Sequence, residues 1–142
     1  MKTYESDHGF VLILEPGEKI KESIKKFAET KSICGFFIGI GAVTNPEIAY
    51  FDIKNKEYVK RKLAGMFEVV NLTGNIRLNT DNKFEVHAHI SLGNKDYNVI
   101  GGHLIEAEVA VVLEIFISKT ASFVRWIFIV KNKYILFIIL NF

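Results

Sequence analysis

The sequence predicts a single α+β domain with one main helix and a mostly antiparallel sheet of six or seven strands. One segment repeats its apolar residues at helical spacing, whereas most later segments are short, apolar or alternating, and separated by turn residues. A chain of 142 residues of which 49% are hydrophobic fits one domain with a substantial core. We therefore treat residues 1–142 as one domain.

The helix is expected directly after the first apolar strand. "GFVLILEPGE", residues 9–18, begins as a strand and ends at a Pro-Gly turn. Ile20, Ile24, Phe27 and Ala28 then follow at i, i+4, i+7 and i+8, which is one apolar helix stripe. The other side of this helix is mostly charged, and the pattern favours a solvated face with ion pairs over a binding surface.

Strands are expected through the rest of the chain. The nearly continuous apolar run at 32–43 predicts a buried strand, and its Cys34 is expected to be a core thiol. Residues 47–63 read as a hairpin that turns near Asn55. The strand predicted at 66–78 contains Gly74, which indicates a bulge or a close backbone approach. Segments 84–92 and 106–118 complete the sheet.

The end of the chain, residues 123–142, is strongly apolar. Its longest uncharged run, Tyr134–Phe142, is about half of what a membrane-spanning helix needs. We therefore predict two short strands or an irregular apolar end, and no membrane partner. The first ten residues are too polar for a signal peptide, so a cytoplasmic location is expected.

Composition and motifs give no support to several classes of function. A net charge of +2 lacks the excess of basic residues that is typical of nucleic-acid-binding domains, and one cysteine allows no internal disulfide. The chain has neither a G-x-S-x-G sequence nor a phosphate-binding loop with lysine. "GIGAVT" at 39–44 lacks the third glycine of a dinucleotide-binding motif.

Two histidines of the predicted strand at 84–92 point to a metal site. Its even positions are all apolar and its odd positions all polar, so His87 and His89 project from one side, about 6–7 Å apart at the backbone. Two imidazoles so placed can converge on one ion. The alternative is that they are surface histidines on the solvent side of the sheet.

A third ligand is expected from the segment that follows. His103 comes after Gly101 and Gly102, which permit a backbone geometry or close approach that larger residues would forbid. If the chain folds back onto the histidine strand, three histidines form an open site for a divalent metal, zinc being the expected ion. Glu68 either accepts hydrogen bonds from these ligands or is solvated on the outer face.

A row of lysines offers a second candidate surface. If the strand stays regular through its turn, Lys54, Lys56, Lys60 and Lys62 share one face with Tyr58. Such a row can contact DNA phosphates without reading sequence. The alternative is an edge strand protected by charge against aggregation.

Five blocks, in order, carry a family resemblance. "GIGAV", "AYFD", "FEVVNLTGNI", "HAHISLGN" and "VIGGHL" resemble the plant and prokaryote conserved (PPC) domain over residues 5–120. The resemblance implies a compact α+β homotrimer. Prokaryotic members are described as predicted DNA-binding proteins, and relatives with the histidine cluster look like metal-containing proteins. The apolar tail at 125–142 departs from the pattern, and the Arg-Gly-Arg hook that plant members use in the minor groove is absent from this sequence.

These observations lead to three expected functions. The first is a trimeric PPC-domain protein with a histidine metal site, in which apolar runs too extensive for one sheet to cover are shared between subunits. The second is a DNA-associated regulator. The third is a metal-dependent hydrolase or lyase, in which the ion activates water. No general acid or base can be assigned, so the sequence leaves open whether the protein is an enzyme.

Overall fold

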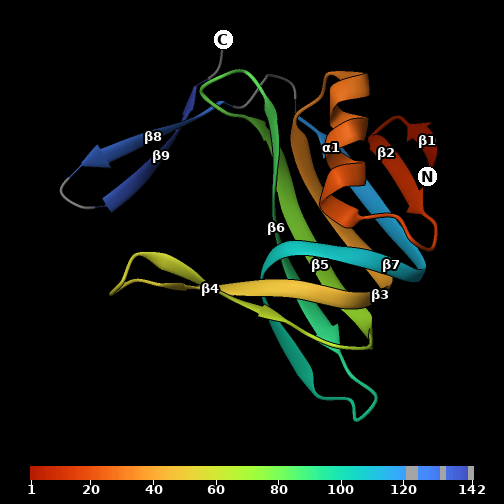
Figure 1. Cartoon of the computed structure of the whole chain (residues 1–142). Coiled ribbons are helices and arrows are strands. Elements are labelled where there is room, and N and C mark those ends of the chain that lie inside the picture. The colour runs from red at the N-terminus through yellow and green to blue at the C-terminus, as the bar shows by residue number, and fades with distance from the viewer. Residues whose placement is uncertain (121–124, 132–133, 141–142) are drawn as a thin grey trace.

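The computed structural model describes residues 1–120, 125–131 and 134–140 (Figure 1). One helix, α1 (Ile20–Lys31), accompanies nine strands in these segments. The strands are β1 (Lys2–Ser6), β2 (Gly9–Leu14), β3 (Gly35–Asp52), β4 (Glu57–Lys62), β5 (Met66–Leu78), β6 (Phe84–Gly93), β7 (Val99–Lys119), β8 (Arg125–Lys131) and β9 (Tyr134–Leu140). All described strand pairs are antiparallel except a single parallel bridge between β5 and β8.

Four strands close into a ring that contains the core. β3 pairs with β5 and β7, and β6 pairs with both β5 and β7. The two longest strands make this possible, because β3 and β7 bend at register shifts and pair with different partners along their lengths. β2 extends the sheet beyond β7, β1 lies outside β2, and β4 pairs with the far half of β3.

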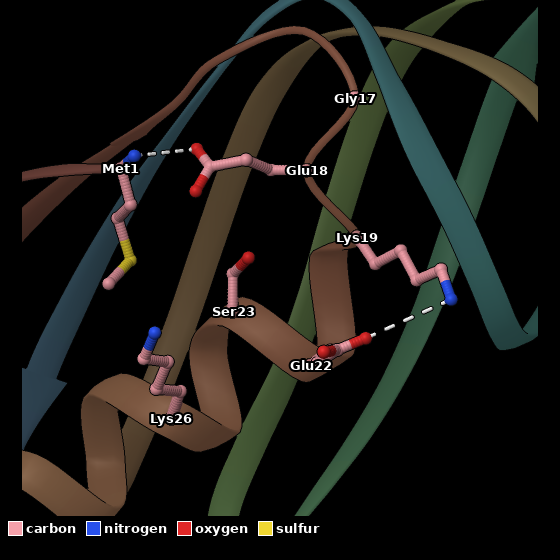
Figure 2. Close-up of a pocket in the computed structure, with 7 residues that line it drawn as sticks. All are labelled: Met1, Gly17, Glu18, Lys19, Glu22, Ser23 and Lys26. Carbon is pink, nitrogen blue, oxygen red and sulfur yellow. Dashed lines mark ion pairs between the residues drawn. The ribbon is translucent and has the colours of Figure 1, made fainter.

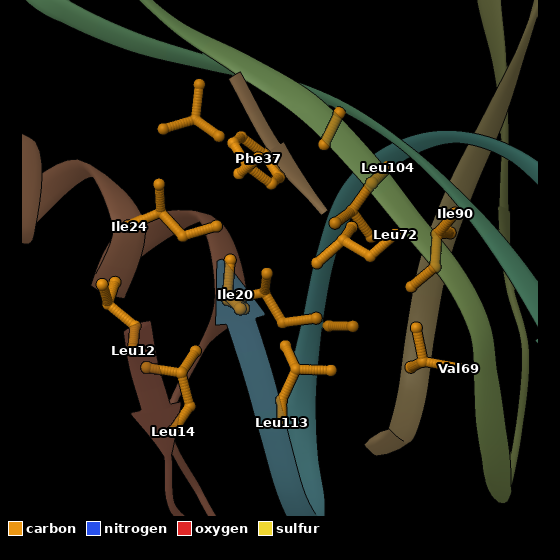
Figure 3. Close-up of a cluster of buried hydrophobic side chains, with 14 of the residues drawn as sticks. Leu12, Leu14, Ile20, Ile24, Phe37, Val69, Leu72, Ile90, Leu104 and Leu113 are labelled. Carbon is orange, nitrogen blue, oxygen red and sulfur yellow. The ribbon is translucent and has the colours of Figure 1, made fainter. Parts of the chain in front are cut away.

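The helix packs its apolar stripe onto this ring. Ile20, Ile24, Phe27 and Ala28 are all buried, as the spacing predicts, and Figure 3 shows two of them among leucines from β2, β5 and β7. On the other face, Lys19–Glu22 and Lys25–Glu29 lie 3.9 Å apart as exposed ion pairs. The expected ion pairs are confirmed, whereas Lys21 on the same side of the helix is half-buried and not solvated as expected.

A distant glutamate caps the start of α1. Lys19 precedes the helix without a side-chain cap, and the Glu106 carboxylate on β7 accepts hydrogen bonds from the backbone N–H groups of Lys21 (2.9 Å) and Glu22 (3.2 Å). These groups have no partner within the helix, and a negative charge there also favours the helix dipole. The cap fixes the start of the helix against β7. Glu106 and His103 both belong to this strand and are close to each other in sequence.

One prediction about β3 is wrong for the isolated chain. The run at 32–43 is predicted to be buried on both faces, but Phe36, Ile38 and Ile40 are 54%, 59% and 59% exposed. The ring has one inner face, so alternate residues such as Phe37 enter the core while their neighbours point outward. Cys34 is buried, as expected.

Most other elements match the sequence, and β1 is an exception. The turn near Asn55, the strand at 66–78 and the two short strands of the tail are confirmed. The sequence pattern does not predict β1, because all of its residues are exposed and it lacks an apolar pattern. Together with the two tail strands it raises the described total to nine. Within the described residues, no helix is long and apolar enough to span a membrane.

Candidate metal centre

The three histidines come together on adjacent strands. In β6 the apolar residues from Val86 to Leu92 point inward and are buried, which leaves His87 and His89 on the outer side. β7 runs antiparallel beside it, with His103 directly opposite His89. Residues opposite one another in a sheet share a face, so His103 joins the other two.

The two glycines allow β7 to pack closely against its neighbouring strands, and the chain does not turn at them. Gly101 and Gly102 lie inside β7, opposite Ser91 and Ile90, and the chain reverses earlier. In that earlier turn the Asn94 side chain accepts backbone hydrogen bonds from Asp96 and Asn98, both at 3.0 Å. The expectation of close approach is confirmed, whereas the turn lies at 94–98 because asparagine stabilises it there.

The three imidazoles lie close enough together that small side-chain rotations would let them bind one ion. One ligand nitrogen from each ring lies within 4.8 Å of the other two, and the ring centroids are 5.1–5.4 Å apart. Nitrogens bound to one tetrahedral zinc ion are about 3.4 Å apart, given bonds of about 2.0–2.1 Å. Side-chain rotations that bring the nitrogens up to about 1.4 Å closer together would therefore complete the geometry.

The polar atoms of this face fit a ligating role. His103 Nδ1 is buried and has no hydrogen-bond partner among the described residues, and the same is true of Asn75 Oδ1, opposite His87 on β5. A buried nitrogen without a partner is unfavourable in a folded protein unless something binds it. The Tyr58 ring covers His103 at a centroid distance of 4.8 Å. The donor set and the unpartnered nitrogen therefore fit a divalent metal.

The surroundings keep two of the imidazoles neutral. Burial lowers the pKa of His103 from 6.5 to about 4, with smaller contributions from the charges of His87 and Lys21. Burial also lowers the pKa of His87, followed by the charge of Arg77. Metal ligands must be unprotonated, so protons compete little with a metal for these nitrogens near neutral pH.

The low pKa of His103 predicts an acid-sensitive metal-free protein. The unfolded chain binds a proton at this residue near pH 6.5 but the folded chain only near pH 4, so the stability contribution is complete above 6.5 and is lost as pH falls through that window. We expect the melting temperature to fall less steeply between pH 7 and 4.5 in His103→Gln than in wild type. His8→Gln, at an exposed turn, is the control. Parallel pH profiles of wild type and His103→Gln would contradict this assignment.

A cavity of about 770 Å³ adjoins the histidines. Its other walls come from α1, the β3–β4 hairpin and the β5–β6 pair, and they contribute Lys21, Lys25, Phe51, Tyr58, Arg77, Phe84, Glu85 and Val86. The sequence pattern assigns few of these residues to the site, because only the fold brings the helix lysines to the histidine face. The alternation of β6 is the one available signal, since it places Glu85 on the same side as His87.

Other residues singled out from the sequence lie elsewhere. Glu68 is exposed, pairs with Gly93 and does not line the cavity, which fits the solvated alternative. Lys60 and Lys62 are exposed on β4, but Lys54 and Lys56 lie in the turn, where Lys56 has a left-handed backbone. The condition for a four-lysine face, a strand that stays regular through its turn, is therefore not met, and only Lys60 and Lys62 share a strand face.

A second hollow, of about 490 Å³, lies beside the N-terminus and lacks such chemistry (Figure 2). The Met1 amine pairs with Glu18 at 2.8 Å, and Lys19 pairs with Glu22 at 3.9 Å. These charges satisfy one another, and no histidine or cysteine is among the described residues that line the hollow. The histidine face is the stronger candidate site.

The fold has relatives of known structure. A plant- and prokaryote-conserved protein from Pyrococcus horikoshii is 35% identical, with a TM-score of 0.81 over 100% of this chain and 94% of that one. A metal-containing protein from Archaeoglobus fulgidus is 33% identical, with a TM-score of 0.81 over 99% and 100% of the two chains. A Bacteroides thetaiotaomicron protein provisionally named as DNA-binding is 23% identical, with a TM-score of 0.88 over 96% and 95%.

The sequence itself carries the family assignment. No protein of curated function matches it significantly. The family model of the Plants and Prokaryotes Conserved (PCC) domain matches residues 1–121, which span β1 to β7 and all three histidines. The chain therefore belongs to the Plants and Prokaryotes Conserved domain family.

Proposed function

We propose that this protein binds a divalent metal ion, zinc by its ligand chemistry, through His87, His89 and His103. The observation that carries the proposal is that ligand nitrogens of all three side chains lie within 4.8 Å of one another. Imidazole suits zinc and other transition metals, and three such ligands leave a coordination position open. The similarity to the metal-containing protein of Archaeoglobus fulgidus supports the same conclusion.

Metal analysis of the untagged protein tests the proposal. After expression with added zinc and removal of loosely bound ions, we expect about one metal ion per chain, since one three-histidine site binds one ion. Elemental analysis with parallel detection of iron, nickel, copper and manganese would identify the ion. Less than about a tenth of an ion per chain would exclude a stable structural or catalytic site.

Trimer formation is the second part of the proposal. Phe36, Ile38 and Ile40 form an exposed apolar stripe on β3, and exposed Phe116 lies opposite Ile38 on β7. Contiguous apolar surface of this kind is typical of subunit interfaces. Cross-strand pairing also connects Ile38 through Thr73 to His89, so association at the stripe would take place beside the metal centre.

Ile38→Lys is expected to disrupt this assembly. Light scattering of wild type should give three times the mass of one chain, whereas the variant should give the mass of one chain with a native circular dichroism spectrum. The reason is that a buried, unpaired ammonium group is strongly unfavourable at an apolar interface. Tyr97→Lys, in the exposed β6–β7 turn, is the control. A monomeric wild-type protein would contradict the trimer.

DNA association is a second candidate function, supported by the exposed Lys60 and Lys62 on β4 and by the provisional name of the Bacteroides relative. We expect duplex DNA to shift in a gel at about 50 mM salt and to be released by about 200 mM, because lysine–phosphate contacts weaken as salt rises. The double variant Lys60→Gln/Lys62→Gln should bind less, and Lys95→Gln should bind as wild type. No shift by wild type at the lower salt would remove this candidate.

A further inference from the structure

The cavity beside the histidines has the size of a small-molecule site. Its volume of about 770 Å³ lies within the range of about 300–1,000 Å³ that is usual for ligand pockets. Side chains reach it from the helix, the β3–β4 hairpin and the β5–β6 pair, so three separate parts of the fold converge there. Lys21 and Arg77 line the same space as the three histidines.

The charges of this cavity favour an anion. Lys21, Lys25 and Arg77 contribute three positive charges, and Glu85 is the one acidic group among the described lining residues. The Glu85 carboxylate already accepts hydrogen bonds from Arg77 at 3.5 Å and from Asn79 at 3.0 Å. A bound divalent ion would add further positive charge. Lys25 also pairs with the exposed Glu29 and Arg77 pairs with Glu85, so the positive excess that a ligand can neutralise comes from Lys21 and a bound metal ion.

Lys21 is the cation best placed to bind such a ligand. Its Nζ donates to the Leu104 carbonyl at 3.3 Å, next to His103, and it forms no ion pair with any residue that the structure describes. The Glu106 cap holds the first turn of α1, so the position of this lysine is fixed by the fold. Its ammonium group retains donors that a bound anion can use.

The remaining walls are aromatic. Phe51 and Tyr58 meet edge to face at 5.1 Å, and the Tyr58 ring also lies over His103. Phe84 contributes a third ring to the lining. Rings of this kind give a ligand apolar contact area at little cost in side-chain entropy. The cavity thus combines a cationic and metal-binding end with an aromatic wall.

We propose that the cavity binds a small organic carboxylate with an aromatic or otherwise apolar body. The carboxylate would lie between Lys21 and the open position of the metal, and the body would pack against Phe51 and Tyr58. This inference rests on the proposed metal site and adds the chemical class of its ligand. A carboxylate is favoured over a phosphate ester because Arg77 already donates to Glu85, and because the described lining has no glycine-rich backbone loop of the kind that phosphate sites commonly use.

Calorimetric titration of the zinc-loaded full chain tests the inference with three probes: phenylacetate, its neutral analogue phenylacetamide, and phenyl phosphate. We expect phenylacetate to bind at least about tenfold more tightly than phenylacetamide, because that difference, about 1.4 kcal/mol, is close to the contribution of one charge-assisted hydrogen bond. Lys21→Gln should weaken phenylacetate binding about tenfold without changing metal content, and Lys21→Arg should restore most of it. Lys26→Gln, on the side of α1 that faces the N-terminal hollow, is the control.

The outcomes separate this inference from the metal site. Equal affinity for phenylacetate and phenylacetamide, no effect of Lys21→Gln, or tighter binding of phenyl phosphate would each overturn the carboxylate assignment while leaving a metal-loaded protein intact. If the wild type binds no metal, the same titrations on the metal-free chain still decide the point. Lys21-dependent phenylacetate binding would then support an anion site without metal, and its absence would overturn the inference.

Discussion

His103→Ala is expected to abolish metal loading, with the metal content of the purified protein falling from about one ion per chain to background. His103 is the one proposed ligand on β7, and its loss leaves two imidazoles on β6. We expect the affinity to fall by more than about a hundredfold, because even changes to groups that only orient metal ligands cost about 10–100-fold.

The same substitution should uncouple stability from zinc. A ligand that binds only the folded state stabilises it by about 4 kcal/mol at a thousandfold excess over its dissociation constant. Wild-type protein should therefore melt at a clearly higher temperature with zinc than with a chelator, whereas His103→Ala should melt at one temperature in both. Thermal unfolding followed by circular dichroism measures the difference.

His8→Ala is the matched control for this experiment. His8 is the one histidine of the chain outside the proposed site, and it lies exposed in the turn between β1 and β2. The substitution therefore removes one imidazole without affecting the site. Its metal content and zinc response should equal those of wild type. If His103→Ala retained a full metal ion with wild-type affinity, the three-histidine site would be refuted.

Alternation within a strand makes part of this site predictable. The apolar and polar positions of β6 assign His87 and His89 to one face from the sequence alone, and the helix stripe is equally local. Whether His103 joins them depends on the register between β6 and β7, because a shift of one residue would send it to the opposite face. The turn at 94–98 and the two glycines set this register.

The remaining parts of the cavity depend on contacts between distant segments. Glu106 caps α1 although the two are 85 residues apart in the chain, and this contact brings Lys21 to the histidine face. In the sequence, Lys21 is one of several lysines on a charged helix face and carries no distinguishing pattern. Tyr58 lies in a lysine-rich run, and its position over His103 follows only from the β3–β4 pairing.

The outward residues of β3 show a second limit on what the sequence can predict. An apolar run indicates that both faces of a strand avoid water, but it does not say what covers each face. In the single chain the inner face packs in the core and the outer face carries Phe36 and Ile38, both exposed. The sequence predicts burial correctly for one face and does not identify what covers the other.

Gly101→Ala is expected to destabilise the fold and the metal centre together. A Cβ atom at this position would lie 2.5 Å from the Ile90 carbonyl oxygen and 3.3 Å from Ser91 Cα. Both are backbone atoms of β6, so no side-chain rotation relieves the overlap and the two strands must separate. We expect a loss of about 3 kcal/mol and a fall in melting temperature of about 10 °C.

The metal centre should respond because the overlap lies next to it. Gly101 is opposite Ser91, and the next outward pair along these strands is His89 and His103. Strand separation would increase the distance between those two ligands, so we expect metal affinity to fall about tenfold even below the melting temperature. Measuring zinc affinity at about 10–15 °C below that temperature separates this effect from unfolding.

Gly93→Ala provides the comparison. Gly93 also lies in the β6–β7 pair, but a Cβ there would meet its nearest atom, Val70 Cγ2, at 3.4 Å, which is an ordinary contact. This variant should have at least wild-type stability, because removing glycine also lowers the entropy of the unfolded chain, and its zinc affinity should be unchanged. Equal behaviour of Gly101→Ala and Gly93→Ala would mean that close packing of β6 against β7 does not hold the histidines together.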